Sequence, residues 1–225
     1  MSDLDTLTLE KDGAVHVPGA VAACLDALRT ALADHPIDKP GVRLRDAGRA
    51  TGFLTADGEI GSVAARALGG EARPVRAVLF DKTAGANWSL NWHQDRTICV
   101  RRRIAVEGFG PWTTKGGMQH VAPPFEVLAR MVTLRVHLDD VPADNAPLLI
   151  APGSHAQGPI SVGDIDTVVS RCGVRTCLAE AGDIWMYATP ILHASEAVAR
   201  PARRRVLQID YANRPLPGGL EWLGV

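Results

Sequence analysis

The chain has 225 residues, and its 24 Lys and Arg nearly balance its 25 Asp and Glu, giving a formal net charge of −1 at pH 7. Proteins that track nucleic acid phosphates need a clustered excess of positive charge, so this composition argues against a nucleic acid partner. No apolar run approaches the roughly 20 residues of a membrane span, and the acidic first residues lack the apolar stretch of a secretion signal. Four cysteines without a CxxC pair are too few for a disulfide scaffold. We therefore expect a soluble, cytoplasmic protein with a single domain over residues 1–225, without a membrane partner.

The first third of the chain, about residues 1–72, is predicted to be helical. One stripe of apolar residues at helical spacing begins just after Pro18, and a shorter one runs from Ile60 to Leu68 and ends at a pair of glycines. The first stripe consists of Val21, Leu25, Leu28 and Leu32.

From Pro74 onward the hydrophobic pattern has a period of two, which predicts strands over about residues 73–213. Each predicted strand has one apolar and one polar face, because successive side chains point to opposite sides. The polar faces could lie in water, or they could line the ligand-filled mouth of a jelly roll. Helices followed by short strands with turn signals favour the jelly roll. The alternating segments are Asn87–Asp95, Thr97–Ile104, Met131–Leu138 and Arg204–Tyr211.

A His-x-Asp pair is the first candidate for metal chemistry. His93 and Asp95 share one face of a predicted strand, so an imidazole and a carboxylate can converge on one metal ion. The pattern is common by chance, and the chain holds a second copy, His137 and Asp139. The facial triad of non-haem Fe(II) oxygenases needs another histidine from a distant strand, and His193 can supply it for the first pair.

An arginine follows that histidine at the start of the next predicted strand. Alternation puts Arg204 on the polar face with Gln208 and Asp210, whereas Arg203 and Arg205 fall on the apolar face. A planar guanidinium suits bidentate binding of the far carboxylate of a dicarboxylic acid. Arg204 is therefore expected to point inward.

In combination, these pieces resemble the phytanoyl-CoA dioxygenase family of Fe(II)/2-oxoglutarate oxygenases over about residues 75–212. The resemblance implies a mainly β fold, a double-stranded β-helix (a cupin-like jelly roll) with flanking N-terminal helices, and Fe(II) and 2-oxoglutarate as cofactor and co-substrate. It is carried by His-Gln-Asp at 93–95, Val-Pro-Ala-Asp-Asn-Ala-Pro-Leu at 141–148, Ala-Pro-Gly-Ser-His at 151–155, Ala-Gly-Asp at 181–183, His-x-Ser at 193–195 and Arg204.

The resemblance also implies the roles of individual residues. His93, Asp95 and His193 would hold iron at the catalytic centre, and Arg204 and Ser195 would bind the distal carboxylate of 2-oxoglutarate. The presence of Asp95 argues against halogenation, because halogenating relatives have a small residue there. The implied reaction uses O₂ to hydroxylate an unactivated C–H bond of a small-molecule substrate and releases succinate and CO₂.

Three further polar residues are candidates for the pocket. Lys82 could bind the 1-carboxylate of the co-substrate or the substrate, or be an ordinary surface lysine. Thr133 and Arg135 share a predicted face with His137 and are expected to line the cavity near the substrate, with a structural salt bridge as the alternative. Ser195 could instead be a core hydroxyl that is satisfied by hydrogen bonding.

Two candidates for substrate contact lie in the middle of the chain. Arg101 begins the Arg101–Arg103 run, which could attract an anionic substrate or lie at a solvated strand edge. Trp112 lies in a glycine-rich segment at 108–117, whose composition suits a mobile lid over the site or a linker that fills a surface groove.

Two other functions remain open for such a chain. One is a jelly roll that binds a metal or ligand without turnover, and the other is a cupin-type metal-dependent isomerase or lyase that needs no oxo acid. Of these three functions, only that of an oxoglutarate enzyme requires Arg204 and Ser195 to bind one carboxylate together. Nothing in the pattern predicts an oligomeric state.

Overall fold

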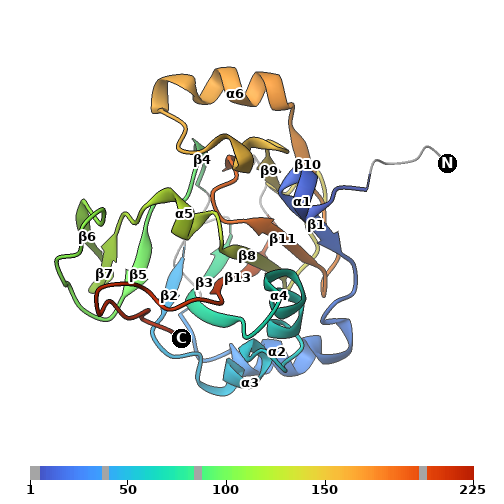
Figure 1. The fold of residues 1–225 in the computed structure, drawn as a ribbon. Helices are drawn as coiled ribbons and strands as arrows, with labels where there is room; N and C mark the ends of the chain where they lie inside the picture. The colour runs from blue at the N-terminus through green and yellow to red at the C-terminus, as the bar shows by residue number, and fades with distance from the viewer. Residues whose placement is uncertain (1–5, 37–40, 84–87, 198–201) are drawn as a thin grey trace.

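A computed structural model describes residues 6–36, 41–83, 88–197 and 202–225 of the chain (Figure 1). The described part forms 13 strands, β1 to β13, in three antiparallel sheets of six, four and three strands. The prediction of a mainly β fold is confirmed. Asn87, the first residue of one predicted strand, lies outside the described ranges.

The six-stranded sheet has β13 near its middle, paired with β8 on one side and β3 on the other. Two of its long strands coincide with the segments predicted at 131–138 and 204–211. In sheet order the strands are β1 (Ala14–Val17), β11 (Ile184–Ala188), β8 (Val132–His137), β13 (Arg204–Ala212), β3 (Arg73–Lys82) and β2 (Val42–Leu44).

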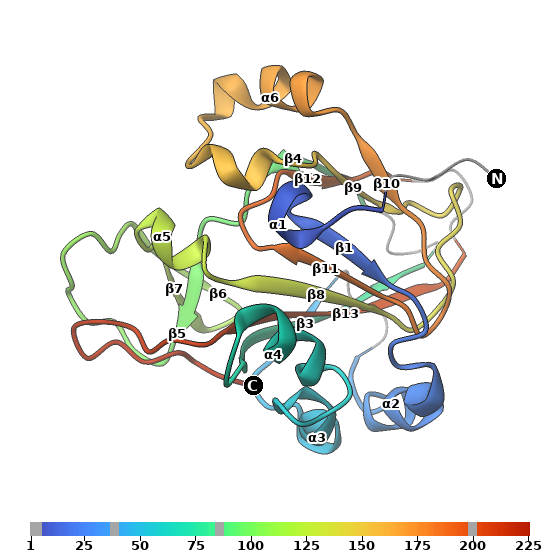
Figure 2. The same ribbon diagram turned by 45° about the vertical axis from the view of Figure 1, so that its right-hand side comes forward.

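The four-stranded sheet lies over the six-stranded one, and the two together make the jelly roll (Figure 2). The strand predicted at 87–95 is shorter than expected: it ends at His93, so Asp95 lies in the loop that follows. In sheet order the strands are β10 (Arg175–Cys177), β9 (Leu148–Ile150), β12 (His193–Ser195) and β4 (Leu90–His93).

A three-stranded sheet stands beside the jelly roll, in the order β5 (Ile98–Val100), β7 (Met118–Val121) and β6 (Trp112–Lys115). The predicted strand at 97–104 was too long, because β5 ends at Val100 and residues 101 and 102 form an exposed bend. The glycine-rich segment at 108–117, predicted to be a lid or a linker, contains β6 in its second half. A two-residue turn joins β6 to β7, and its glycines, Gly116 and Gly117, have φ of 57° and 72°, as a type I′ hairpin requires.

Short helices cover the outer face of the six-stranded sheet, and α6 covers the smaller sheet (Figures 1 and 2). The stretch before residue 73 is not purely helical, because β1 and β2 form the two edges of the larger sheet. No helix in the described ranges has the length and apolar character needed to cross a bilayer. The α-helices are α1 (Leu9–Asp12), α2 (Leu25–Ala31), α3 (Thr51–Leu54), α4 (Gly61–Leu68), α5 (Phe125–Leu128) and α6 (Ile165–Cys172), and the 3₁₀ helices are η1 (Ala22–Cys24), η2 (Gly48–Ala50), η3 (Ser154–Gln157) and η4 (Val162–Asp164).

The largest apolar core lies between the larger sheet and the N-terminal helices. Leu207 and Ile209 of β13 are fully buried there together with Leu28 of α2. Tyr211 continues the same face, and its hydroxyl donates a hydrogen bond of 3.1 Å to the Leu54 carbonyl of α3. With its apolar residues turned outward to the helices, β13 presents its polar residues to the space between the two sheets.

Replacing Leu28 by Ala tests this core. Leu28 is 0% exposed, and we expect Leu28→Ala to lower the free energy of unfolding by about 2–5 kcal/mol in urea denaturation, because a buried cavity is left. The matched control is Leu178→Ala, at a leucine that is 46% exposed, with an expected change within about 0.5 kcal/mol. Equal losses in the two variants would contradict the packing of α2 on the sheet.

Candidate functional site

Two histidines from distant parts of the sequence meet in the smaller sheet. His193 of β12 is paired directly with His93 of β4, and the ring centroids are 4.2 Å apart. The Nδ1 atoms lie 2.8 Å from the Asn91 carbonyl oxygen (His93) and 2.9 Å from the Ile191 carbonyl oxygen (His193). With Nδ1–H donating to these carbonyls, each Nε2 keeps its lone pair, which is the arrangement found in metal-binding histidines.

The Asp95 carboxylate is held beside this pair by an arginine of the larger sheet. Arg76 Nη2 donates to Asp95 Oδ2 at 3.0 Å, and Arg76 Nε pairs with Asp210 Oδ2 at 2.6 Å. Arg76 on β3 lies directly opposite Asp210 on β13. Asp210 Oδ1 in turn accepts a hydrogen bond of 3.0 Å from the Thr133 hydroxyl on β8. A chain of polar contacts thus runs from the loop after β4 across three strands of the larger sheet.

The local charges favour an ionised Asp95 and a neutral His193. Burial alone would raise the pKa of Asp95, but the positive charge of Arg76, its hydrogen bond and the nearby histidines lower it below its usual value. Burial lowers the pKa of His193 to about 4, although Asp95 opposes this. These are the protonation states in which the groups bind a metal.

The three side chains are near one another but not closed into a metal site. Among the residues that the structure describes, no group of three or more His, Cys, Asp or Glu is gathered tightly enough to hold a metal ion. One Asp95 oxygen, Oδ2, is engaged by Arg76, while Oδ1 has no hydrogen bond to the described part of the chain. A complete triad with His93 and His193 would require Asp95 to present that free oxygen to the imidazoles.

Three basic side chains lie between the sheets, further along the same inner face. We call Lys82, Arg135 and Arg204 the cation cluster; they are 0%, 6% and 3% exposed. Arg204 of β13 lies directly opposite Lys82 of β3. In the described ranges none of the three has a carboxylate partner.

The cluster is bound only to neutral groups. Lys82 Nζ donates to the Glu196 carbonyl at 2.6 Å, and Arg135 Nη1 donates to Gln208 Oε1 at 2.8 Å. Burial and the nearby arginines lower the pKa of Lys82 to about 8, and burial and Arg135 lower that of Arg204 to about 9. Positive charges that repel one another in a buried space, with no acid between them, indicate a site for an anion.

The Ala146 carbonyl brings Ser195 next to Arg204. Arg204 Nη1 donates to this oxygen, and the Ser195 hydroxyl lies 3.4 Å from it. The Nε atom of Arg204 is buried without a hydrogen-bond partner. The two residues to which the family resemblance assigns carboxylate binding therefore lie close together, and Arg204 Nε remains available as a hydrogen-bond donor.

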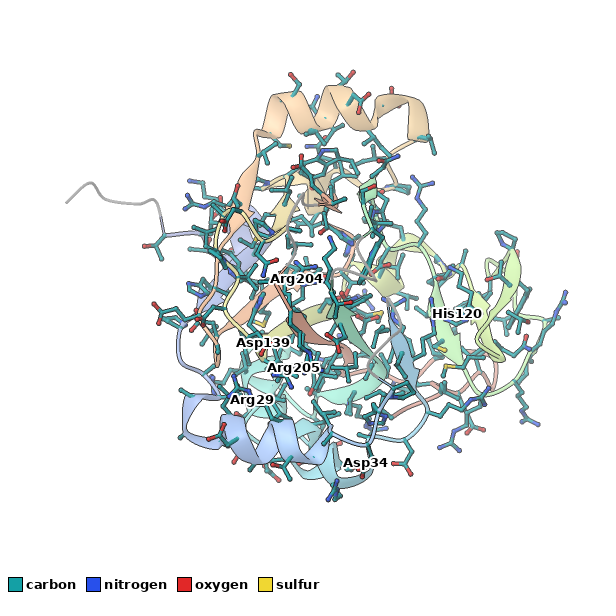
Figure 3. The ribbon with its side chains drawn as sticks, turned by 180° about the vertical axis from the view of Figure 1, so that it is seen from behind. Arg29, Asp34, His120, Asp139, Arg204 and Arg205 are labelled. Carbon is teal, nitrogen blue, oxygen red and sulfur yellow. The ribbon has the colours of Figure 1, made fainter. Side chains whose placement is uncertain are left out.

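The alternating pattern correctly predicted that Arg204 and Arg205 point to opposite sides of the sheet. Arg205 points away from the cluster and pairs with Asp139 at 2.6 Å, and Arg29 of α2 lies 3.9 Å from the same carboxylate. Figure 3 shows Arg205, Asp139 and Arg29 together, with Arg204 on the side toward the smaller sheet. Because His137 faces inward and Asp139 does not, the second His-x-Asp pair does not share a site.

The remaining candidates divide between the site and the surface. The Thr133 hydroxyl is buried and bonded to Asp210, so it supports the Arg76 chain. Arg101 is exposed and pairs with Glu221 at 3.3 Å, and Trp112 is half-buried against the core of the three-stranded sheet. The structure does not bring Arg101 or Trp112 to the histidine pair.

Sequence reasoning missed Arg76 and the role of Gln94. Alternation along β3 puts Arg76 on its polar face, but its partners depend on the strand register, which the pattern does not contain. Gln94 is buried, and its amide donates to the Pro190 carbonyl at 2.9 Å and accepts from the Ile160 backbone N–H at 2.9 Å. It ties the loop between His93 and Asp95 to two other segments.

The chain belongs to the phytanoyl-CoA dioxygenase (PhyH) family, whose model matches residues 9–206. This agrees with the resemblance that the sequence carries. No curated protein matches the chain.

Solved structures with a similar fold include three enzymes of low sequence identity. EctD from S. alaskensis is 18% identical, with a TM-score of 0.65, over 94% of this chain and 77% of that one. SnoK, a non-heme alpha ketoglutarate dependent carbocyclase from nogalamycin biosynthesis, is 16% identical, with a TM-score of 0.61, over 100% and 88%. HygX from Streptomyces hygroscopicus, with nickel and 2-oxoglutarate bound, is 14% identical, with a TM-score of 0.62, over 96% and 91%. These likenesses show the fold.

The support of Asp95 by Arg76 and Asp210 can be tested with Co(II). Asp210→Asn removes the second carboxylate partner of Arg76, so that Asp95 becomes the only carboxylate paired with this arginine in the described ranges. We expect the affinity for Co(II), followed by its visible absorption, to fall about 10- to 100-fold, as is typical when the support of a metal ligand is lost. Asp139→Asn, whose carboxylate faces the other side of the sheet, should bind Co(II) as the wild type does. An unchanged affinity in Asp210→Asn would contradict the supporting role.

Proposed function

We propose that the chain is an Fe(II)- and 2-oxoglutarate-dependent dioxygenase that hydroxylates an unactivated C–H bond of a small molecule. The observation that carries the proposal is the pairing of His93 with His193 beside Asp95, on the same inner space as the buried Arg204. One arrangement of residues thus offers a site for a metal and a site for an anion.

The residues fit iron in type and protonation. Two neutral imidazoles and one carboxylate are the ligand set of the facial triad, which leaves coordination positions open for a co-substrate and O₂. The Nδ1 hydrogen bonds to Asn91 and Ile191 fix the rings so that Nε2 is the metal-binding atom. We assign His93, Asp95 and His193 as ligands.

Two members of the cation cluster, Arg204 and Lys82, fit the distal carboxylate of 2-oxoglutarate, a dicarboxylate. Arg204 and Ser195 would bind its distal carboxylate, and Lys82, directly opposite Arg204, would add a second positive charge. Burial strengthens such charge-assisted hydrogen bonds, because water does not compete for them. HygX binds nickel and 2-oxoglutarate, which supports the same pairing of metal and co-substrate in this chain.

When bound, iron and 2-oxoglutarate supply the oxidising chemistry: one atom of O₂ goes to the substrate and the other to succinate, with release of CO₂. The protein's residues hold and shield the reactants. Arg76 keeps Asp95 ionised and in place, Arg204 fixes the far end of the co-substrate, and the two sheets exclude water. The presence of a carbocyclase among similar structures makes the product the point to test, since hydroxylation adds one oxygen to the substrate and ring closure adds none. We further propose that the protein acts in the cytoplasm, without a nucleic acid or membrane partner.

Anaerobic titration with Fe(II) and 2-oxoglutarate tests the proposal directly. The wild type should develop the visible charge-transfer band of the iron–oxoglutarate chelate. His193→Ala should lose the band. Arg204→Gln should need at least about tenfold more 2-oxoglutarate, since losing a charged hydrogen bond costs roughly 1.5–3 kcal/mol.

Arg205→Gln is the matched control, because this neighbouring arginine points to Asp139 on the other side of the sheet. Its titration should match the wild type. A metal-loaded wild type with no band would overturn the co-substrate assignment and favour a binding protein or a cupin-type isomerase. A band with equal 2-oxoglutarate affinity in all variants would overturn the assignment of Arg204.

A further inference from the structure

Arg76 and Arg135 both lie on the inner face of the larger sheet, but they differ in whether a carboxylate pairs with them. Arg76 is paired with two carboxylates, Asp95 and Asp210. Arg135, also buried, has no carboxylate partner in the described ranges, although it is as deep in the fold. Burying a charge without a partner costs free energy of folding. We therefore expect an anion from outside the chain to pair with Arg135.

The surroundings of Arg135 leave hydrogen-bonding capacity open. Its Nη1 donates to the neutral Gln208 amide, its guanidinium lies 5.4 Å from the Phe80 ring centroid, and its Nε has no partner. His137, two residues along on the same face of β8, is 1% exposed with neither ring nitrogen hydrogen-bonded. Arg135 and His137 therefore form a built, buried donor site.

In the proposed function, 2-oxoglutarate does not pair with all three positive charges of the cation cluster. Its distal carboxylate is assigned to Arg204 and Ser195, with Lys82 directly opposite Arg204. Its other carboxylate would bind the metal. Arg135 is then left over, so a second anion is needed to balance it.

A row of paired residues connects Arg135 to the edge of the sheet. Arg43 of the edge strand β2 is opposite Val78, Val78 is opposite Gln208, and Gln208 is opposite Arg135. Residues paired in this way lie on the same face of a sheet. Arg43 is exposed and has no ion pair within the described residues, so it offers a positive charge where the inner face meets solvent.

We propose that the primary substrate carries an oxyanion, a carboxylate or a phosphate, which binds Arg135 with His137 as a hydrogen-bond donor. This rests on the proposed function, because it assumes that 2-oxoglutarate occupies Arg204. It deepens that function by assigning the chemical class of the substrate.

Inorganic phosphate and acetate are suitable probes. In protein loaded with Co(II) and saturated with 2-oxoglutarate, the paramagnetic ion should speed the ³¹P relaxation of phosphate or the ¹H relaxation of acetate in a saturable way. Arg135→Gln should weaken binding of the better probe at least tenfold while leaving 2-oxoglutarate affinity within twofold. Arg135→Lys, which keeps the charge, should restore part of the binding. The two probes distinguish a phosphate site from a carboxylate site.

The surface variant Arg49→Gln is the control, since Arg49 pairs with Asp34 on the helical side and should leave both affinities unchanged. The proposal is overturned if neither probe shows saturable relaxation, or if Arg135→Gln binds them as the control does. It is also overturned if Arg135→Gln weakens 2-oxoglutarate instead, because Arg135 would then belong to the co-substrate site. Failure of the proposed function itself is seen separately, as absence of the iron–oxoglutarate band.

Discussion

The two-faced strand β13 is the constraint on which both the fold and the site depend. Leu207 and Ile209 are buried against the N-terminal helices, and Arg204 and Asp210 face the space between the sheets. A shift of one residue would exchange the two faces, placing charges in the apolar core and leucine beside the histidines. Pairing with β3 and β8 on both sides prevents that shift. Stability and site geometry are therefore set by the same register.

The inner space combines paired and unpaired charge. Around Arg76 every charged group has a partner within the protein, and this part of the site is held rigidly through Asp95 and Asp210. Arg135 and Arg204 have no carboxylate partner in the described ranges, and burial together with Arg135 lowers the pKa of Arg204. We propose that the fold tolerates these buried unpaired cations because its ligands supply the missing negative charge there. In this account, binding of 2-oxoglutarate stabilises the folded protein as well as starting the reaction.

The sequence correctly predicted the strands, helix and side-chain orientations that depend on the hydrophobic periodicity within one segment. The strands at 131–138 and 204–211, the inward Arg204 and the helix that ends at Gly69 all follow from local alternation or spacing. It predicted poorly what depends on how segments pair. Arg76 was not singled out because its partners come from a loop and a strand far along the chain. The strand predicted at 97–104 was too long, and the strand within 108–117 was missed, because a third, small sheet stands beside the jelly roll. Trp112 lies in that sheet, and Arg101 follows its strand β5.

We expect one metal ion and one dicarboxylate to occupy this inner space together. The decisive measurement is a crystal structure of the protein grown anaerobically with Fe(II) and 2-oxoglutarate. Anomalous scattering should place iron on His93 Nε2, His193 Nε2 and Asp95, with the distal carboxylate of 2-oxoglutarate on Arg204 and Ser195. Iron bound elsewhere, or 2-oxoglutarate bound away from Arg204, would contradict the account.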